Sequence, residues 1–289
     1  MEIGFDTLAE ASSILYWRAV TRLPPDVTSA IRGALDSETD EGARLILESM
    51  LENSELAVSR SLPICQDVGI RVFFIEMPVD CTFEGNPLTA IADGIEDATR
   101  THHLRPNCVD PLTRKNTGNN RGNRYPVVHF TYTSSESVRI TLLAKGSGSE
   151  SRSAVRMVNP VEGLTGVRNF ILETVAKGAA LSCPPVVVGV GIGGSFESVA
   201  GLSKLALTRP LNKPNSRADL AELEASLVED INSLGIGPMG LGGRTTALSV
   251  LIELGDTHIT CLPVAVNMSC WAHRRAVALV DEDGFRVVD

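Results

Sequence analysis

Residues 182–195 have the sequence SCPPVVVGVGIGGS, which joins a cysteine to a short β-branched run and a glycine-rich turn. The run predicts a buried strand, and the residues after it predict an amphipathic helix. The glycines match G-x-G-x-x-G, a pattern that brings a pyrophosphate to a helix N-terminus. Cys183, stiffened by the two prolines after it, instead suggests a metal ligand. The two ends of this stretch therefore predict different functions.

The composition is that of an ordinary globular protein, with 289 residues, 43% of them hydrophobic and 21% charged. The net charge of −9 argues against a general surface for nucleic acid or acidic membranes. No apolar run is long enough to span a membrane, and Glu2 and Asp6 replace the basic start of a secretory signal. We therefore expect a cytoplasmic protein with no nucleic-acid or membrane partner, whose six cysteines are thiols or ligands.

Hydrophobic periodicity predicts an α/β chain. The first helix is expected to start at a Thr7-x-x-Glu10 capping box and to end before Pro24. Further helices are expected at 26–35, 39–58, 87–103, 164–181, 195–207 and 217–234, and strands at 71–75, 126–133, 138–144, 186–190, 246–254 and 262–266. The strands at 126–133 and 138–144 suggest a hairpin. The predicted fold is mixed α+β, with several helices around mixed β-sheets and no true Rossmann fold. We expect one domain, 1–289, which could divide into lobes 1–160 and 161–289.

Four irregular stretches have the composition of functional loops. Cys65-Gln66-Asp67 places a thiol beside an amide and a carboxylate, directly before a strand. Residues 105–124 form a long polar loop rich in arginine, which could build an anion pocket or a solvated surface. The glycine-serine turn after Lys145 could hold an anion on its backbone amides or could be a flexible exit from the hairpin. Residues 234–243 are too rich in glycine for regular structure and too apolar for a linker, which fits a loop packed closely against a cofactor or another backbone.

The dinucleotide interpretation lacks its second element. It requires an acidic residue at a strand end about twenty residues after the glycines, whereas the nearest acid, Asp219, lies in a predicted helix. The metal interpretation has more support, because Cys65, Cys183 and Cys270 each lie at a turn beside a predicted strand. Three such thiolates could hold three irons of a [4Fe-4S] cluster and leave the fourth iron open to a substrate oxygen. Spacing alone leaves both interpretations open. The remaining cysteines are expected to be small buried hydrophobes.

An ordered set of motifs gives the chain a resemblance to one family. It resembles the α subunit, or N-terminal half, of class I iron-sulfur fumarases and the related L-tartrate dehydratases. The resemblance extends from the first helices to Arg275 and rests on these segments: 63–69 (PICQDVG), 104–106 (LRP), 114–118 (RKNTG), 145–150 (KGSGSE), 183–194, 234–237 (LGIG) and 263–270.

The resemblance implies specific assignments. Cys65, Cys183 and Cys270 would hold the cluster. Gln66, Asp67, Arg105 and His258 would face a C4 dicarboxylate, with Asp67 and His258 as catalytic residues. The loop containing Lys145, Gly146 and Gly148 would lie close by. The family's proton-abstracting residue lies on a second polypeptide, so the resemblance implies a β subunit, an α2β2-type assembly and an inactive isolated chain.

Two departures from the family pattern concern the substrate. Val68 stands where the family usually has threonine, and Ser147 where it usually has glycine. Residues 271–275 look more like tartrate dehydratase, whereas residues 145–150 and 257–259 look more like fumarase. We therefore expect reversible hydration of fumarate to L-malate, with L-tartrate dehydration as the alternative. A dinucleotide-binding oxidoreductase and a cluster-free assembly or regulatory protein are hypotheses of other classes.

Overall fold

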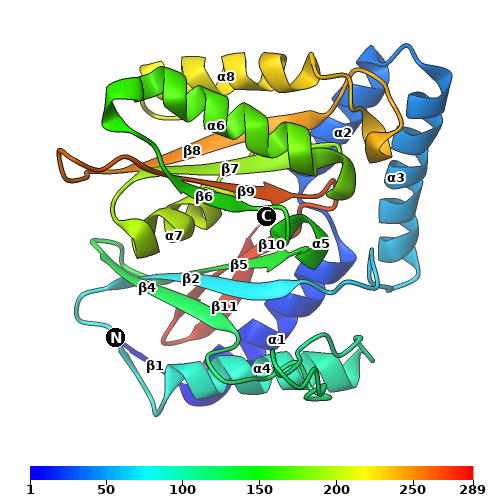
Figure 1. Ribbon diagram of the computed structural model, residues 1–289. Helices are drawn as coiled ribbons and strands as arrows, with labels where there is room; N and C mark the ends of the chain where they lie inside the picture. Colours follow the sequence, from blue (N-terminus) through cyan, green and yellow to red (C-terminus); the bar gives the residue numbers. More distant parts are fainter. Residues whose placement is uncertain (289) are drawn as a thin grey trace. The chain divides into compact units, whose positions relative to one another are not determined.

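A computed structural model describes residues 1–288, which form two compact units (Figure 1). Unit 1 contains residues 1–24, 54–145 and the chain from Arg274 onward. Unit 2 contains residues 25–53 and 146–273. The units thus interleave along the sequence, whereas the two lobes suggested by the sequence would meet at a single point near residue 160. We describe each unit by itself.

Unit 1 is built on a five-stranded mixed sheet with the strand order β11-β10-β5-β2-β4. Its elements are β1 (Glu2–Ile3), α1 (Phe5–Thr21), β2 (Ile70–Pro78), β3 (Thr82–Phe83), α4 (Pro87–Thr101), β4 (Val127–Thr133), β5 (Val138–Lys145), β10 (Arg275–Asp281) and β11 (Gly284–Val288). The short strands β1 and β3 pair in parallel beside this sheet. The core lies between the sheet and α1, because Leu15 and Tyr16 of α1 are buried with Phe73 of β2 and Ile140 of β5.

Helices α1 and α4 pack closely because Gly94 has no side chain. A Cβ at Gly94 would lie 2.2 Å from the carbonyl oxygen of Ala9. The predicted Thr7 capping box is wrong, since α1 begins earlier, at Phe5, after an N-cap Gly4 that makes no side-chain cap bond. The carboxylate of Glu84 accepts the Phe5 backbone N–H at 3.3 Å instead. The backbone N–H group at the start of α1 is thus capped by Glu84, which is distant in sequence, and not by Thr7.

The predicted hairpin of β4 and β5 is also wrong. Strand β2 lies between them, parallel to β4 and antiparallel to β5. The segment Val72–Ile75 of β2 is buried throughout, which a central strand requires and an edge strand does not. The sheet with β2 between β4 and β5 buries this apolar run, which a direct β4–β5 hairpin would leave without a central position.

Unit 2 is built on a four-stranded mixed sheet with the order β6-β9-β7-β8. Its elements are α2 (Pro25–Ser37), α5 (Ser147–Glu150), β6 (Ala154–Met157), η1 (Pro160–Glu162), α6 (Gly163–Gly178), η2 (Ala179–Leu181), β7 (Val186–Gly193), α7 (Phe196–Ala206), α8 (Ala218–Asn232), η3 (Pro238–Gly240), β8 (Ala247–Gly255) and β9 (Pro263–Ser269). Helix α3 (Glu41–Ser59) contains the boundary between residues 53 and 54.

The central strand β7 explains the two layers of helices in unit 2. Its residues Val186, Val188 and Val190 are buried in one core with α6 and α8. The alternate positions Gly189 and Gly191 face α7, because a Cβ at either would meet the backbone of that helix. Figure 1 shows α7 on the face of the sheet opposite α6 and α8. The alternation follows from the two-residue period of a strand.

The predicted fold class is confirmed, since helices surround mixed sheets and the sheet order is not that of a doubly wound fold. Among residues 1–288, no helix combines the length and apolar character needed to cross a membrane.

Candidate functional site

The turn at Cys65 in unit 1 presents its thiol to solvent. Cys65 is exposed, and its Sγ accepts the Asp67 backbone N–H at 3.4 Å. The Asp67 carboxylate accepts the Gly69 backbone N–H at 2.9 Å. Gly69 has a φ of +84°, and a Cβ there would lie 2.7 Å from the Ala144 carbonyl carbon. The shape of the turn therefore requires glycine at this position.

Two buried arginines donate hydrogen bonds to backbone carbonyl groups of this turn. Arg71 is fully buried, and its guanidinium donates to the Gly69 carbonyl at 2.6 Å and to the Asn120 carbonyl at 3.0 Å. Arg274 is 1% exposed and donates from Nη1 to the Asp67 carbonyl. Arg71 is not among the site residues predicted from the sequence. The available signal was a single cation at the start of an otherwise apolar strand, since buried charges need specific partners.

The Arg71 guanidinium lies over two tyrosine rings. Its Cζ is 4.5 Å from the ring centroid of Tyr125 and 5.6 Å from that of Tyr16. Burial raises the pKa of Tyr16 to about 12, although the neighbouring Arg71 cation opposes the rise. Burial likewise raises the pKa of Tyr125. Both phenols therefore stay neutral, and the charge of Arg71 is available to the two carbonyl groups that it contacts.

Arg71→Met is expected to lower the free energy of unfolding by about 3 kcal/mol, because it leaves two buried carbonyl groups without donors. Losing the bond to Asn120 should also speed proteolysis in the loop at 104–124. Urea denaturation and limited trypsin digestion measure these effects. Arg139→Met is the control, because Arg139 is exposed and its ion pair with Glu76 is long, at 3.7 Å. This substitution should lower the free energy of unfolding by less than about 1 kcal/mol. Equal losses in both variants would contradict the assignment.

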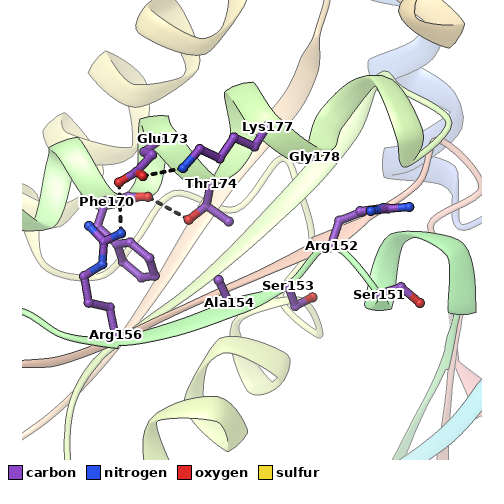
Figure 2. A pocket seen from close by; sticks show the side chains of 10 residues that line it. All are labelled: Ser151, Arg152, Ser153, Ala154, Arg156, Phe170, Glu173, Thr174, Lys177 and Gly178. Atoms are coloured by element: carbon purple, nitrogen blue, oxygen red, sulfur yellow. Dashed lines mark hydrogen bonds and ion pairs between the residues drawn. The ribbon is translucent and has the colours of Figure 1, made fainter.

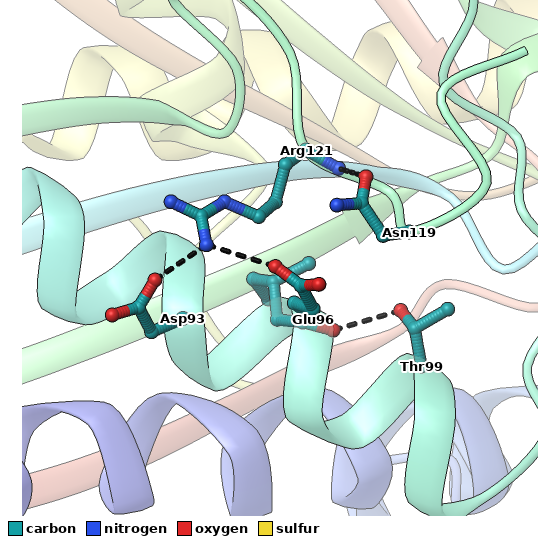
Figure 3. Close-up of polar contacts among 6 residues, drawn as sticks. Asp93, Glu96, Thr99, Asn119 and Arg121 are labelled. Atoms are coloured by element: carbon teal, nitrogen blue, oxygen red, sulfur yellow. Dashed lines mark hydrogen bonds and ion pairs between the residues drawn. The ribbon is translucent and has the colours of Figure 1, made fainter.

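The polar loop at 104–124 is ordered by its own contacts. Arg105 Nη1 donates to the side-chain oxygen of Gln66 at 3.1 Å, which brings two predicted substrate residues together. Arg121 instead contacts α4, with Nη1 2.5 Å from Asp93 Oδ1 and 2.8 Å from Glu96 Oε2 (Figure 3). The bond from Arg121 lowers the pKa of Glu96. Arg105 therefore contacts a predicted site residue, whereas Arg121 holds the loop to α4.

The segment from Lys145 to Glu150 is more regular than a flexible exit. Lys145 ends β5 and is fully buried. Gly146 precedes α5, and its carbonyl accepts the Glu150 backbone N–H at 3.0 Å. Gly148 is exposed, and a Cβ there would meet nothing within 4 Å. Glu150 forms an ion pair with Lys204 and accepts the Asn267 amide at 3.0 Å. The turn is thus anchored through Glu150 to α7 and β9.

Cys183 and Cys270 lie at neighbouring strand ends in unit 2. Strands β7 and β9 are antiparallel with Val187 opposite Ser269, so the turn that precedes β7 and contains Cys183 lies at the same end of the sheet as Cys270, which follows β9. The Trp271 backbone N–H donates to the Cys183 carbonyl at 3.1 Å and links the two turns. Cys183 is exposed and Cys270 is partly exposed. The structure therefore brings these two predicted ligands together.

The glycine-rich loop at 234–243 supports the Cys183 turn. The Met239 backbone N–H donates to the Pro184 carbonyl at 2.8 Å. The loop is folded on itself, because a Cβ at Gly237 would lie 1.8 Å from the Gly242 carbonyl oxygen. Glu38, only 3% exposed, accepts the backbone N–H of Arg244 at 2.7 Å and that of Thr39 at 2.8 Å. Of the two predicted neighbours of this loop, a cofactor or another backbone, the structure shows the backbone.

Glu38→Gln is expected to lower the free energy of unfolding by about 2 kcal/mol at pH 7, because it weakens charge-assisted bonds. Burial raises the pKa of Glu38, but the N–H groups of Asp40, Arg244 and Thr39 outweigh it and hold the pKa below its usual 4.5. A lowered pKa stabilises the folded chain above the unfolded pKa, and this stabilisation is lost as the pH falls through the folded value. Urea denaturation at pH 7 and pH 3 should show the variant and wild type converging at pH 3. A gap independent of pH would contradict this explanation.

The glycines of residues 189–194 do not form a pyrophosphate site. A Cβ at Gly189 would lie 2.2 Å from the Ser203 carbonyl oxygen, and one at Gly191 would lie 2.3 Å from that of Val199. These glycines therefore let α7 approach β7. The amides of the turn are already used, since Gly194 N donates to the Gly255 carbonyl at 3.1 Å and Ser195 N to Ser198 Oγ at 2.8 Å. The Gly194 and Ser195 amides are therefore not free to bind a pyrophosphate, which argues against the dinucleotide interpretation.

His258 is not brought to the two cysteines within unit 2. It lies in the turn after β8, where Gly255 pairs with Gly193 at the far end of β7. A strand of eight residues separates the two ends by about 25 Å. The His258 Nδ1 lies 2.9 Å from Thr260 Oγ1, within its own turn. His273 is buried with both ring nitrogens near hydrogen-bonding oxygens, which is a structural position.

The cysteine chemistry separates into two groups. None of the six cysteines forms a disulfide. Cys81 and Cys108 are buried as expected, whereas Cys261, which is also expected to be buried, is partly exposed. Burial raises the pKa of the Cys81 thiol. Within residues 1–288, no three His, Cys, Asp or Glu side chains lie together so as to hold a metal ion. Of the three cysteines predicted as ligands, Cys65 in unit 1 and Cys183 in unit 2 are exposed, and Cys270 in unit 2 is partly exposed.

Comparisons with known proteins agree on one family. The family model described as fumarate hydratase (Fumerase) matches residues 9–279. A protein of Methanocaldococcus jannaschii, named as a candidate L(+)-tartrate dehydratase subunit alpha, is 39% identical over 273 residues, which cover 93% of this chain and 96% of that protein. The L(+)-tartrate dehydratase subunit alpha of Escherichia coli (strain K12) is 35% identical over 264 residues, covering 91% and 87%. The chain therefore belongs to the fumarate hydratase (Fumerase) family.

Proposed function

We propose that this chain is the α subunit of a two-subunit [4Fe-4S] hydro-lyase that hydrates fumarate reversibly to L-malate. The observation that carries the proposal is the pair of Cys183, which is exposed, and Cys270, which is partly exposed, in two neighbouring turns linked by the hydrogen bond from Trp271 N to the Cys183 carbonyl. The family match supports the reaction class.

Cys65, Cys183 and Cys270 are the proposed cluster ligands. Their thiols are exposed or partly exposed, and backbone N–H donation to Cys65 Sγ is the kind of contact that stabilises a thiolate. A cluster held by three cysteines supplies a Lewis-acidic iron with an open coordination position. The proposal requires all three thiols to reach one cluster in the assembled enzyme.

Two loops, at residues 66–67 with Arg105 and at residues 145–148, are the proposed contacts for the C4 dicarboxylate. Gln66 and Arg105 already contact each other and offer amide and guanidinium donors to one carboxylate. Asp67 keeps its carboxylate on the Gly69 amide, near the Cys65 thiol. Lys145, with Gly146 and Gly148 after it, remains a proposed contact for the second carboxylate. His258 has no assigned function in this proposal, because β7 separates it from Cys183 and Cys270.

Hydration adds a proton to one alkene carbon and hydroxide to the other, so the reverse reaction requires a group that removes a carbon-bound proton. We propose that a β subunit carries this group, in an α2β2-type cytoplasmic assembly. The names of the Methanocaldococcus jannaschii and Escherichia coli relatives, which specify subunit alpha, support a partner. The same names favour L-tartrate dehydration to oxaloacetate as the second candidate function.

Anaerobic co-purification with the partner subunit tests both candidates. The expected complex contains iron and sulfide, shows broad visible absorbance, and converts fumarate to malate. Fumarate, malate and L-tartrate are then assayed with the same preparation. Turnover of tartrate without malate would assign the second function, and a colourless iron-free complex with full activity would contradict the cluster.

A further inference from the structure

A surface pocket of about 280 Å³ opens between α6 and β6 in unit 2 (Figure 2). Ala154, Phe170 and Gly178 form its apolar lining. The polar residues that line it include three cations, Arg152, Arg156 and Lys177, and one carboxylate, Glu173. The pocket therefore has an excess of two positive charges in a chain whose net charge is −9.

One end of the pocket shares a single carboxylate between two cations. Arg156 Nη2 lies 3.0 Å from Glu173 Oε2, and Lys177 Nζ lies 2.5 Å from Glu173 Oε1. The Arg156 guanidinium is also stacked on Phe170, with its Cζ 4.5 Å from the ring centroid. Figure 2 shows these side chains meeting above β6. Glu173 fixes the two cations in place but neutralises only one of them, so this end can accept a second anionic group.

The other end contains two polar groups without protein partners. Within residues 1–288, the Arg152 guanidinium makes no ion pair or hydrogen bond, and the Ser153 hydroxyl oxygen is buried without a hydrogen-bond partner. Figure 2 shows Arg152 extending toward α5, away from Glu173. A buried hydroxyl without a partner is uncommon and suggests a ligand or bound water. An arginine beside a hydroxyl matches the needs of a carboxylate or phosphate group.

We propose that this pocket binds a small molecule that carries two or more carboxylate or phosphate groups. Arg152 lies in the turn before β6 and Arg156 lies within β6, so their Cα atoms are separated by at most about 13 Å. A ligand with separated anionic groups can therefore contact both ends. Its volume suits a tricarboxylate or a small phosphate ester. Gly178, which lines the pocket, is linked to the turn that contains Cys183, because its carbonyl accepts the Ser182 hydroxyl at 2.8 Å. The pocket is thus a candidate effector site.

Calorimetric titration of the assembled enzyme with citrate, and separately with inorganic phosphate, tests this proposal. Citrate is expected to bind, with phosphate weaker because it has one anionic group. Arg152→Gln should weaken citrate binding at least about tenfold, and Ser153→Ala severalfold. Ser153→Ala should not lower stability, because the hydroxyl has no protein partner to lose. Arg217→Gln is the control, since it removes an exposed cation of unit 2 outside the pocket and should leave binding unchanged.

Three results would overturn the proposal. These are absence of citrate binding to the assembled enzyme, equal affinity in Arg152→Gln and wild type, and citrate binding that disappears in Cys183→Ser. The first includes the case in which a partner subunit covers the pocket. The third would assign the bound anion to the proposed substrate site. Binding is measured without turnover, so failure of the hydro-lyase proposal leaves this result interpretable.

Discussion

Cys183→Ser is expected to lower the hydration rate by about a thousandfold or more and to remove the visible absorbance of the cluster. A Lewis-acidic metal contributes several kcal/mol to such a reaction, and each 1.4 kcal/mol is about tenfold in rate. Serine keeps the size of the side chain but is a poor ligand for iron. Cys183 is exposed, so the substitution leaves no cavity in the core. Steady-state kinetics, iron analysis and absorbance of the anaerobic complex measure the three effects.

Cys81→Ala is the matched control for the loss of a thiol. Cys81 is buried beside β3, and its substitution should cost about 1 kcal/mol of stability while leaving iron content and turnover unchanged. Cys270→Ser should behave like Cys183→Ser, because both thiols are proposed ligands of the same cluster. Retention of both iron and activity in Cys183→Ser would reject the ligand assignment. Equal losses in Cys81→Ala would show that folding, not ligation, explains the result.

Gly191→Ala is expected to lower the free energy of unfolding by about 3 kcal/mol. Its Cβ would lie 2.3 Å from the Val199 carbonyl oxygen and 2.8 Å from Ser203 N, both in the backbone of α7. Because backbone atoms cannot rotate away, the helix must shift from the sheet and lose packing along its length. For a chain of this size, the thermal midpoint should fall by about 6–12 °C. Circular dichroism during thermal and urea denaturation measures the change.

Gly201→Ala tests the same substitution on the same helix without the clash. Gly201 lies in α7, and a Cβ there would meet nothing within 4 Å. Alanine should therefore stabilise the chain by about 0.5–1 kcal/mol through helix propensity. A Gly191→Ala variant as stable as wild type would show that α7 can move away from β7 at little cost.

The helices and most strands follow from the sequence because each buries one face. Periodicity predicts α2, α4 and α8 within a few residues, since their apolar stripes are regular. It fails where the competing partner is distant in sequence. The N-terminus of α1 is satisfied by Glu84, and β2 separates β4 from β5. Neither contact leaves a local signal.

The candidate site is predictable to a smaller extent. The chemistry of Cys65, Cys183 and Cys270 is visible in the sequence, and the meeting of Cys183 with Cys270 follows from their positions beside two strands. The glycine pattern is predicted as a strand, turn and helix, but its conformational freedom serves helix packing instead of phosphate binding. Burial of Arg71 and the distance of His258 from the cysteines depend on strand order, which periodicity does not encode.

The interleaved units set an order in which the chain can fold during synthesis. Strand β5 of unit 1 pairs with β10, which begins at Arg275. At ribosomal rates of about 5–20 residues per second, the chain between them takes roughly 6–26 s to make. Residues 146–273, which contain all four strands of the unit 2 sheet, are made in that interval, so this sheet can form first. Until β10 arrives, β5 has an unpaired edge, and such an edge invites aggregation. Nascent chains stalled before Arg274 should therefore be the form that chaperones bind.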